Sequence, residues 1–138
     1  MSMTRRETLL LAMGSAVAAA LPFKAFAEAD AAIAAFTGGA TVGSEGITLI
    51  APEIAENGNT VPVEVNAPGA ESIMILAAGN PTPGVATFHF GAMAGAQSAS
   101  TRIRLAGTQD VIAIAKMPDG SFVQTSQEVK VTIGGCGG

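Results

Sequence analysis

The chain has 138 residues, with seven basic and eleven acidic side chains and a net charge of −4 at pH 7. The basic residues are scattered, so the sequence has no basic stripe that would bind a nucleic-acid backbone or an anionic membrane surface. It contains one histidine and one cysteine, too few nitrogen and sulfur ligands for a typical zinc or copper site. We therefore expect no metal and no cofactor.

The first residues have the features of an export signal. Arg5 and Arg6 precede an apolar run of about 13 residues, which is too short for a comfortable membrane span of about 20 residues. An A-x-A cleavage signal at 25–27 places the cut before Glu28. The sequence thus predicts a signal peptide over 1–27 and a periplasmic mature protein without membrane contact. The paired arginines favour the twin-arginine route, with the general secretory route as the alternative.

Cleavage after residue 27 would leave 111 of the 138 residues, enough for one domain over 28–133. This part has four basic and ten acidic residues, and therefore a net charge of −6. Its first stretch, 29–36, is rich in alanine and predicts a short helix, which the glycines at 38 and 39 should end.

The rest of the domain has the period-two pattern of strands, with Gly/Pro turns between them. The predicted strands are 46–50, 61–66, 72–77, 85–90, 100–105, 110–116 and 122–133. Seven short strands in about 100 residues indicate an all-β fold, an immunoglobulin-like antiparallel β-sandwich. The Cys…Trp…Cys signature of true immunoglobulin domains is absent.

Two of the predicted strands are apolar on both faces: "SIMILAA" at 72–78 and "VIAIA" at 111–115. A sheet in a two-layer sandwich normally exposes one face to water. We expect a protein partner to cover the additional apolar face. Coverage by the chain's own loops or by the N-terminal helix is the alternative.

The usual catalytic patterns are missing. His89 lies between Phe88 and Phe90 and is interpreted as an ordinary strand residue, although a Cys–His pair with the cysteine is formally conceivable. Glu53 and Glu56 flank a turn and are expected to be solvated. No serine has a G-x-S-x-G elbow around it.

The chain ends in Gly-Gly-Cys-Gly-Gly, and Cys136 is its single cysteine. Glycine is the most permissive residue, so 134–138 should form a flexible arm that reaches at most about 17 Å beyond the fold. No basic group next to the thiol would lower its pKa from the ordinary value of about 8.5. Such a thiol is a poor autonomous nucleophile but suits a group that other proteins activate.

These features leave three functions open. The first is a carrier that holds a group covalently on Cys136. The second is a periplasmic β-sandwich interaction module in which Cys136 links two chains by a disulfide. The third is a thiol enzyme, which the lack of a nearby base or a second cysteine disfavours.

The combination of a twin-arginine-like signal, a small β-domain and a terminal "GGCGG" resembles the SoxY family of sulfur carriers. The stretches "AFTGGA" at 35–40 and "IAENGNTVPVEV" at 54–65 support the resemblance. It implies that Cys136 is the covalent attachment site for sulfur intermediates of thiosulfate oxidation. The residues of the arm would then be Gly134, Gly135, Gly137 and Gly138.

The resemblance also implies partners. The carrier would form a heterodimer with SoxZ. The haem proteins SoxAX would couple thiosulfate to the thiol as a cysteine S-thiosulfonate, SoxB would release sulfate by hydrolysis, and SoxCD would oxidise the remaining sulfane sulfur. The carrier itself would be neither an enzyme nor a metalloprotein.

Overall fold

The computed structural model describes residues 24–133, and within 24–27 only the backbone. One helix and nine strands make up this part of the chain. The helix is α2 (Lys24–Thr37). The strands are β1 (Val42–Gly43), β2 (Thr48–Ile50), β3 (Ile54–Ala55), β4 (Val61–Asn66), β5 (Ser72–Ala77), β6 (Gly84–His89), β7 (Ser98–Ile103), β8 (Gln109–Lys116) and β9 (Phe122–Val131).

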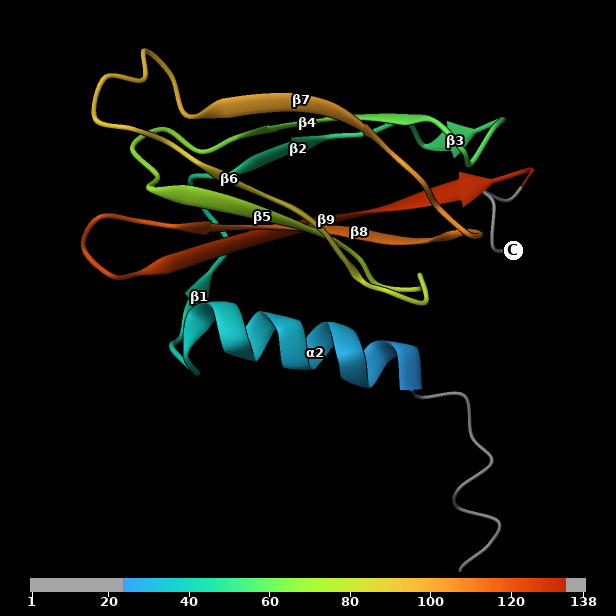
Figure 1. Cartoon of the computed structure of the whole chain (residues 1–138), viewed down its shortest axis with the longest axis horizontal. Coiled ribbons are helices and arrows are strands. Elements are labelled where there is room, and N and C mark those ends of the chain that lie inside the picture. Colours follow the sequence, from blue (N-terminus) through green and yellow to red (C-terminus); the bar gives the residue numbers. More distant parts are fainter. Residues whose placement is uncertain (1–23, 134–138) are drawn as a thin grey trace, which may run out of the picture.

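The strands form two sheets that face each other (Figure 1). The larger sheet has the order β1-β9-β8-β5-β6, with β3 added on β9, and the smaller sheet has the order β2-β4-β7. The predicted all-β sandwich is therefore confirmed. Its main strand pairs are antiparallel, as expected. The sheet is nevertheless mixed, because the two-residue strands β1 and β3 both run parallel to β9.

The interior lies between the two sheets and follows from the alternation in the sequence. In β4, Val61, Val63 and Val65 are buried, whereas Pro62 and Glu64 are exposed. This period of two fixes the register of β4, since a slip of one residue would turn its three valines outward. The largest fully buried side chains of the described part are Val61, Val65, Ile73, Ile75, Leu76, Leu105, Val111, Ile114 and Val129.

Helix α2 covers the outer face of the larger sheet (Figure 1). Its residues Ala32, Ile33 and Phe36 pack against a second apolar cluster formed by Leu76, Ile114 and Phe122. The rings of Phe36 and Phe122 meet edge to face, with centroids 5.7 Å apart. The expectation that a partner protein covers the apolar outer faces of these strands is therefore wrong for Leu76 and Ile114. The alternative, the N-terminal helix, is what buries them.

The helix predicted at 29–36 lies within α2, which begins earlier and ends at Thr37. Gly38 and Gly39 follow with φ of 64° and 82°, a left-handed conformation that glycine adopts without strain and that ends helices. Gly38 N–H donates to the carbonyl of Ala34 at 2.8 Å, and the Thr37 hydroxyl donates to the carbonyl of Ile33 at 2.9 Å. No helix in the described part is long and apolar enough to span a membrane.

All seven predicted strands exist, and β4 and β5 have the predicted bounds. The strand predicted at 100–105 lies instead at Ser98–Ile103, because Ser98 and Ala99 pair with Asn66 and Val65 of β4. The strand predicted at 122–133 ends at Val131. The sequence analysis missed β1 and β3, because two residues are too few to show a periodicity.

Candidate functional site

The predicted attachment residue Cys136 and its glycines Gly134, Gly135, Gly137 and Gly138 lie outside the described residues. What the structure does describe is the place where the chain leaves the sandwich on its way to Cys136. We call residues 130–133, the end of β9 and the two residues after it, the arm root.

On one edge of β9 the arm root pairs with β3. Lys130 N–H donates to the carbonyl of Glu53 at 2.9 Å, and Thr132 N–H donates to the carbonyl of Ala55 at 3.1 Å. Strand β3 follows β2 of the smaller sheet along the chain and pairs with β9 of the larger sheet (Figure 1). This short parallel pair therefore joins the arm root to the other layer of the sandwich.

The turn after β3 adds two hydrogen bonds to the last two described residues. The Thr132 hydroxyl donates to the carbonyl of Glu56 at 3.0 Å. Gly58 N–H donates to the carbonyl of Ile133 at 2.8 Å. Gly58 is buried, and its own carbonyl accepts the N–H of Leu105 at 2.8 Å. Both backbone polar groups of Gly58 are thus used to connect the arm root to the segment after β7.

The other contact comes from the loop before β8. Val131 N–H donates to the Thr108 hydroxyl at 2.9 Å. The arm root therefore has hydrogen bonds from two segments that are far apart in the sequence. Ile133, the last described residue, has 66% of its surface exposed.

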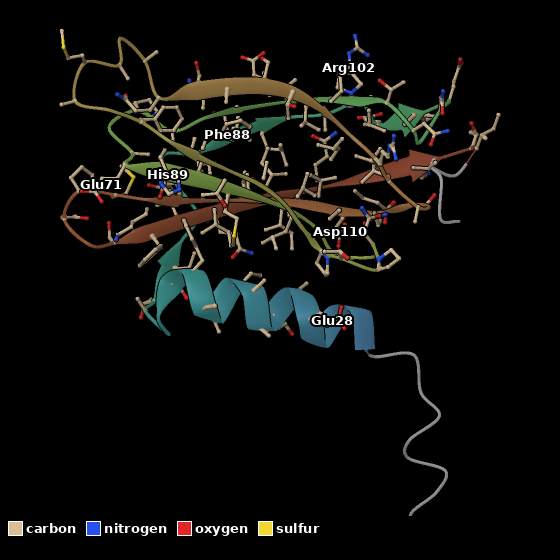
Figure 2. All side chains as sticks on the ribbon, in the orientation of Figure 1. Glu28, Glu71, Phe88, His89, Arg102 and Asp110 are labelled. Atoms are coloured by element: carbon tan, nitrogen blue, oxygen red, sulfur yellow. The ribbon has the colours of Figure 1, made fainter. Side chains whose placement is uncertain are left out.

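His89 lies at the other end of the sandwich. It is exposed at the end of β6, while Phe88 and Phe90 on either side pack against the core, so its predicted alternation with the two phenylalanines is confirmed. The strand registers place His89 level with Phe122 at the start of β9. Figure 2 shows it beside Glu71, far from the end of β9 at which β3 lies.

The distance excludes a Cys–His pair within one chain. Val131 lies at the opposite end of β9 from Phe122, roughly 30 Å away at about 3.3 Å per residue. Cys136 lies three residues beyond Ile133, a span of at most about 11 Å. The thiol therefore cannot reach His89 from its own arm root.

The two glutamates of the predicted turn lie where the sequence analysis placed them. Glu53 and Glu56 are exposed, as expected for solvated turn residues. Among the described residues no group of three or more His, Cys, Asp or Glu side chains could hold a metal ion. An open groove of about 550 Å³ lies on the outer face of the smaller sheet. Its lining is Ile50, Ala51, Pro52, Pro62, Val63, Glu64, Ser100, Thr101 and Arg102.

The sequence analysis did not find the residues that hold the arm root. Thr108 lies 23 positions before Val131, and Gly58 lies 75 positions before Ile133. Nothing in a single sequence links positions so far apart, because the contacts arise only once the strands are paired. The available signals were the turn sequences "ENGN" at 56–59 and "AGT" at 106–108, which predict turns but not what those turns contact.

Comparison with known proteins identifies relatives of this chain. The family model described as "Sulfur oxidation protein SoxY" matches residues 33–136, so the match extends to Cys136. The structure of the sulfur carrier protein SoxY from Chlorobium limicola f thiosulfatophilum is 39% identical, with a TM-score of 0.66 over 78% of this chain and 98% of that one. A comparison with curated protein sequences found no significant match.

Two more distant likenesses show the fold alone. A superoxide reductase (neelaredoxin) from Ignicoccus hospitalis has a TM-score of 0.56 at 16% identity, covering 64% of this chain and 81% of that one. A putative superoxide reductase from Thermotoga maritima has a TM-score of 0.52 at 18% identity, covering 70% and 89%. One β-sandwich architecture thus supports different functions, and the function must be argued from the site.

Proposed function

The chain belongs to the SoxY family of sulfur oxidation proteins, and from this premise we propose that it is the sulfur carrier of a thiosulfate-oxidising system, with its cargo bound covalently to Cys136. The observation that carries the proposal is the family match, which covers residues 33–136 and ends on the single cysteine of the chain. The exposed arm root supports it, since the chain leaves the sandwich at the surface three residues before the thiol.

The proposed chemistry assigns the protein one role at each step. In loading, the Cys136 thiolate and thiosulfate form a new S–S bond, and the two electrons released go to an external acceptor in the partner enzyme. In unloading, water adds to the terminal sulfur of the adduct, the S–S bond to it breaks, and sulfate and protons leave. One sulfane sulfur then remains on Cys136. The carrier supplies the sulfur atom to which the cargo is attached and presents the cargo to its partners. The partners supply the redox and hydrolytic chemistry.

The partners follow from the same premise. We assign loading to the haem proteins SoxAX, hydrolysis to SoxB and oxidation of the sulfane sulfur to SoxCD, with SoxZ as the heterodimer partner. The carrier works in the periplasm after export on the signal 1–27. In this role it is not an enzyme and needs no cofactor, which agrees with a thiol that has no neighbouring base in the sequence.

The test is to replace the attachment atom alone. In a reconstituted system with the partner enzymes, Cys136→Ser should abolish thiosulfate-dependent electron transfer, because a hydroxyl does not form the S–S bond. Its melting temperature should equal that of the wild type, since Cys136 lies five residues after the end of β9, the last strand of the described part. Thiosulfate oxidation at the wild-type rate by Cys136→Ser would refute the carrier function.

A further inference from the structure

Two hydrogen-bonded side-chain amides, Gln109 and the half-buried Asn80, lie beside the arm root. Gln109, at the start of β8, has only 9% of its surface exposed. Its Nε2 donates to Asn80 Oδ1 at 2.8 Å and to the carbonyl of Gly107 at 3.0 Å. Its Oε1 accepts the N–H of Gly79 at 2.9 Å. The amide of Gln109 therefore has a partner for each of its hydrogen-bonding groups except one lone pair.

Asn80, in the turn between β5 and β6, completes the network. Its Oδ1 accepts a second hydrogen bond, from Ala106 N–H at 2.9 Å, and its Nδ2 donates to the carbonyl of Arg104 at 2.8 Å. Asn80 and Gln109 together bind the backbone of residues 104, 106 and 107. The two side chains thus hold the loop 104–108 between β7 and β8 in one conformation.

The same loop contacts the arm root by two routes. Leu105 N–H donates to the carbonyl of Gly58, and Gly58 N–H donates to the carbonyl of Ile133, each at 2.8 Å. The Thr108 hydroxyl accepts the N–H of Val131 at 2.9 Å. The loop therefore reaches both Val131 and, through Gly58, the last residue of the sandwich.

We propose that Asn80 and Gln109 are positioning residues for the carrier thiol, which act through the loop 104–108 to fix the point at which the chain leaves the sandwich. This inference rests on the proposed carrier function. Cys136 is only three residues from Ile133, at most about 11 Å, so a displaced arm root displaces the whole volume that the thiol can reach. The reacting group of a partner enzyme has a fixed place, so it meets the thiol less often when that volume shifts. The effective concentration of the thiol at the reacting group is then lower.

A purely structural role makes a different prediction. Hydrogen-bonded amides with little solvent exposure also stabilise a fold, and removing one partner leaves unpaired groups at a cost in stability. If stability were the whole role, any substitution with the same cost would have the same effect on carrier activity. The test must therefore separate a local change at the arm root from a general loss of stability.

Two variants remove hydrogen bonds at different distances from the arm root. Gln109→Met keeps the approximate shape of the side chain and removes its hydrogen bonds. Thr108→Val keeps the shape at an exposed position and removes only the bond to Val131. Thr108→Ser retains the hydroxyl and should behave as the wild type. Ile73→Val, a fully buried core position on β5, lowers stability away from the loop and is the matched control.

The measurement is the kcat/KM with which the thiosulfate-coupling enzyme loads each mature carrier, followed by the intact mass of the carrier. We expect kcat/KM to fall about fivefold in Gln109→Met and Thr108→Val, which corresponds to about 1 kcal/mol. The rate of Cys136 alkylation by iodoacetamide should not change, because a small reagent needs no fixed approach. Amide exchange at 105–108 and 131–133 should become faster in these two variants alone.

The outcomes distinguish the two proposals. A wild-type carrier that gains no sulfur from the partner refutes the carrier function itself. A wild type that loads, with both variants loading at the same kcat/KM, overturns the positioning role while the carrier function stands. An equal fall in Ile73→Val would show that stability alone is responsible. If Gln109→Met does not fold, the loading kcat/KM of Thr108→Val compared with that of Thr108→Ser decides between the positioning role and a purely structural one.

Discussion

At the scale of single residues, Asp119 shows how one turn is held by a carboxylate. Ser121 donates to it twice, from its hydroxyl at 2.6 Å and from its N–H at 2.9 Å. These hydrogen bonds, the hydroxyl bond first, lower the pKa of Asp119 below its ordinary value, because they stabilise the charged form. Gly120 between them has a φ of 86°, which favours glycine in this turn.

The lowered pKa predicts a small loss of stability in acid. A carboxyl whose pKa is lower in the folded state stabilises the fold above its unfolded pKa of about 3.9, and this contribution is lost as the pH falls through the folded value. Asp119→Asn, which has no charge to lose, should be less stable than the wild type at pH 7 and should approach it below pH 4. Denaturant unfolding at both pH values measures this, and a constant difference would contradict it.

At the scale of elements, α2 replaces the partner protein that the sequence suggested. The apolar outer faces of β5 and β8 were identified correctly, but a pattern of buried residues does not say what buries them. The helix itself was predicted from alanine content and two glycines. Its contact with the sheet depends on Ala32, Ile33 and Phe36, and these residues all follow the predicted signal cleavage before Glu28.

The helix contact predicts a specific loss of stability. Phe36→Ala removes the edge-to-face pair with Phe122 and opens space over Leu76 and Ile114. We expect a loss of about 2 kcal/mol, less than for a fully buried phenylalanine because Phe36 is only half-buried. Ala35→Ser, at an exposed position of the same helix, should change stability by less than about 0.5 kcal/mol. Equal denaturation midpoints for Phe36→Ala and the wild type would show that the helix does not stabilise the sheet.

At the scale of the whole molecule, the sequence predicted the sandwich because long strands have clear periodicity. Val61, Val63 and Val65 alternate with the exposed residues Pro62, Glu64 and Asn66, and such a pattern is sufficient to place a strand and its buried face. The arm root was not predictable in the same way. Its hydrogen bonds to Thr108 and Gly58 join segments that meet only in the folded chain, and a threonine or glycine in a turn has many other uses.

The two ends of the sandwich differ in a way that matters for the carrier function. His89 lies at one end, and the arm root lies at the other (Figure 2). In the proposed carrier, activation of Cys136 falls to the partner enzymes, because His89 lies too far away to act as its base. This division of roles distinguishes a carrier from a thiol enzyme. The disulfide-linked alternative requires Cys136 to be in a disulfide in the active protein, so the redox state of Cys136 tests it.

The most direct test of the account is the intact mass of the mature protein after incubation with thiosulfate and the thiosulfate-coupling enzyme, followed by peptide mapping. The account predicts a mass increase of one thiosulfate-derived S–SO₃ group, located on Cys136 and removed by reductant. The same incubation of Cys136→Ser should give no increase. An unmodified Cys136 in the wild type, or a disulfide-linked dimer that remains active and loses its activity with reductant, would contradict the account.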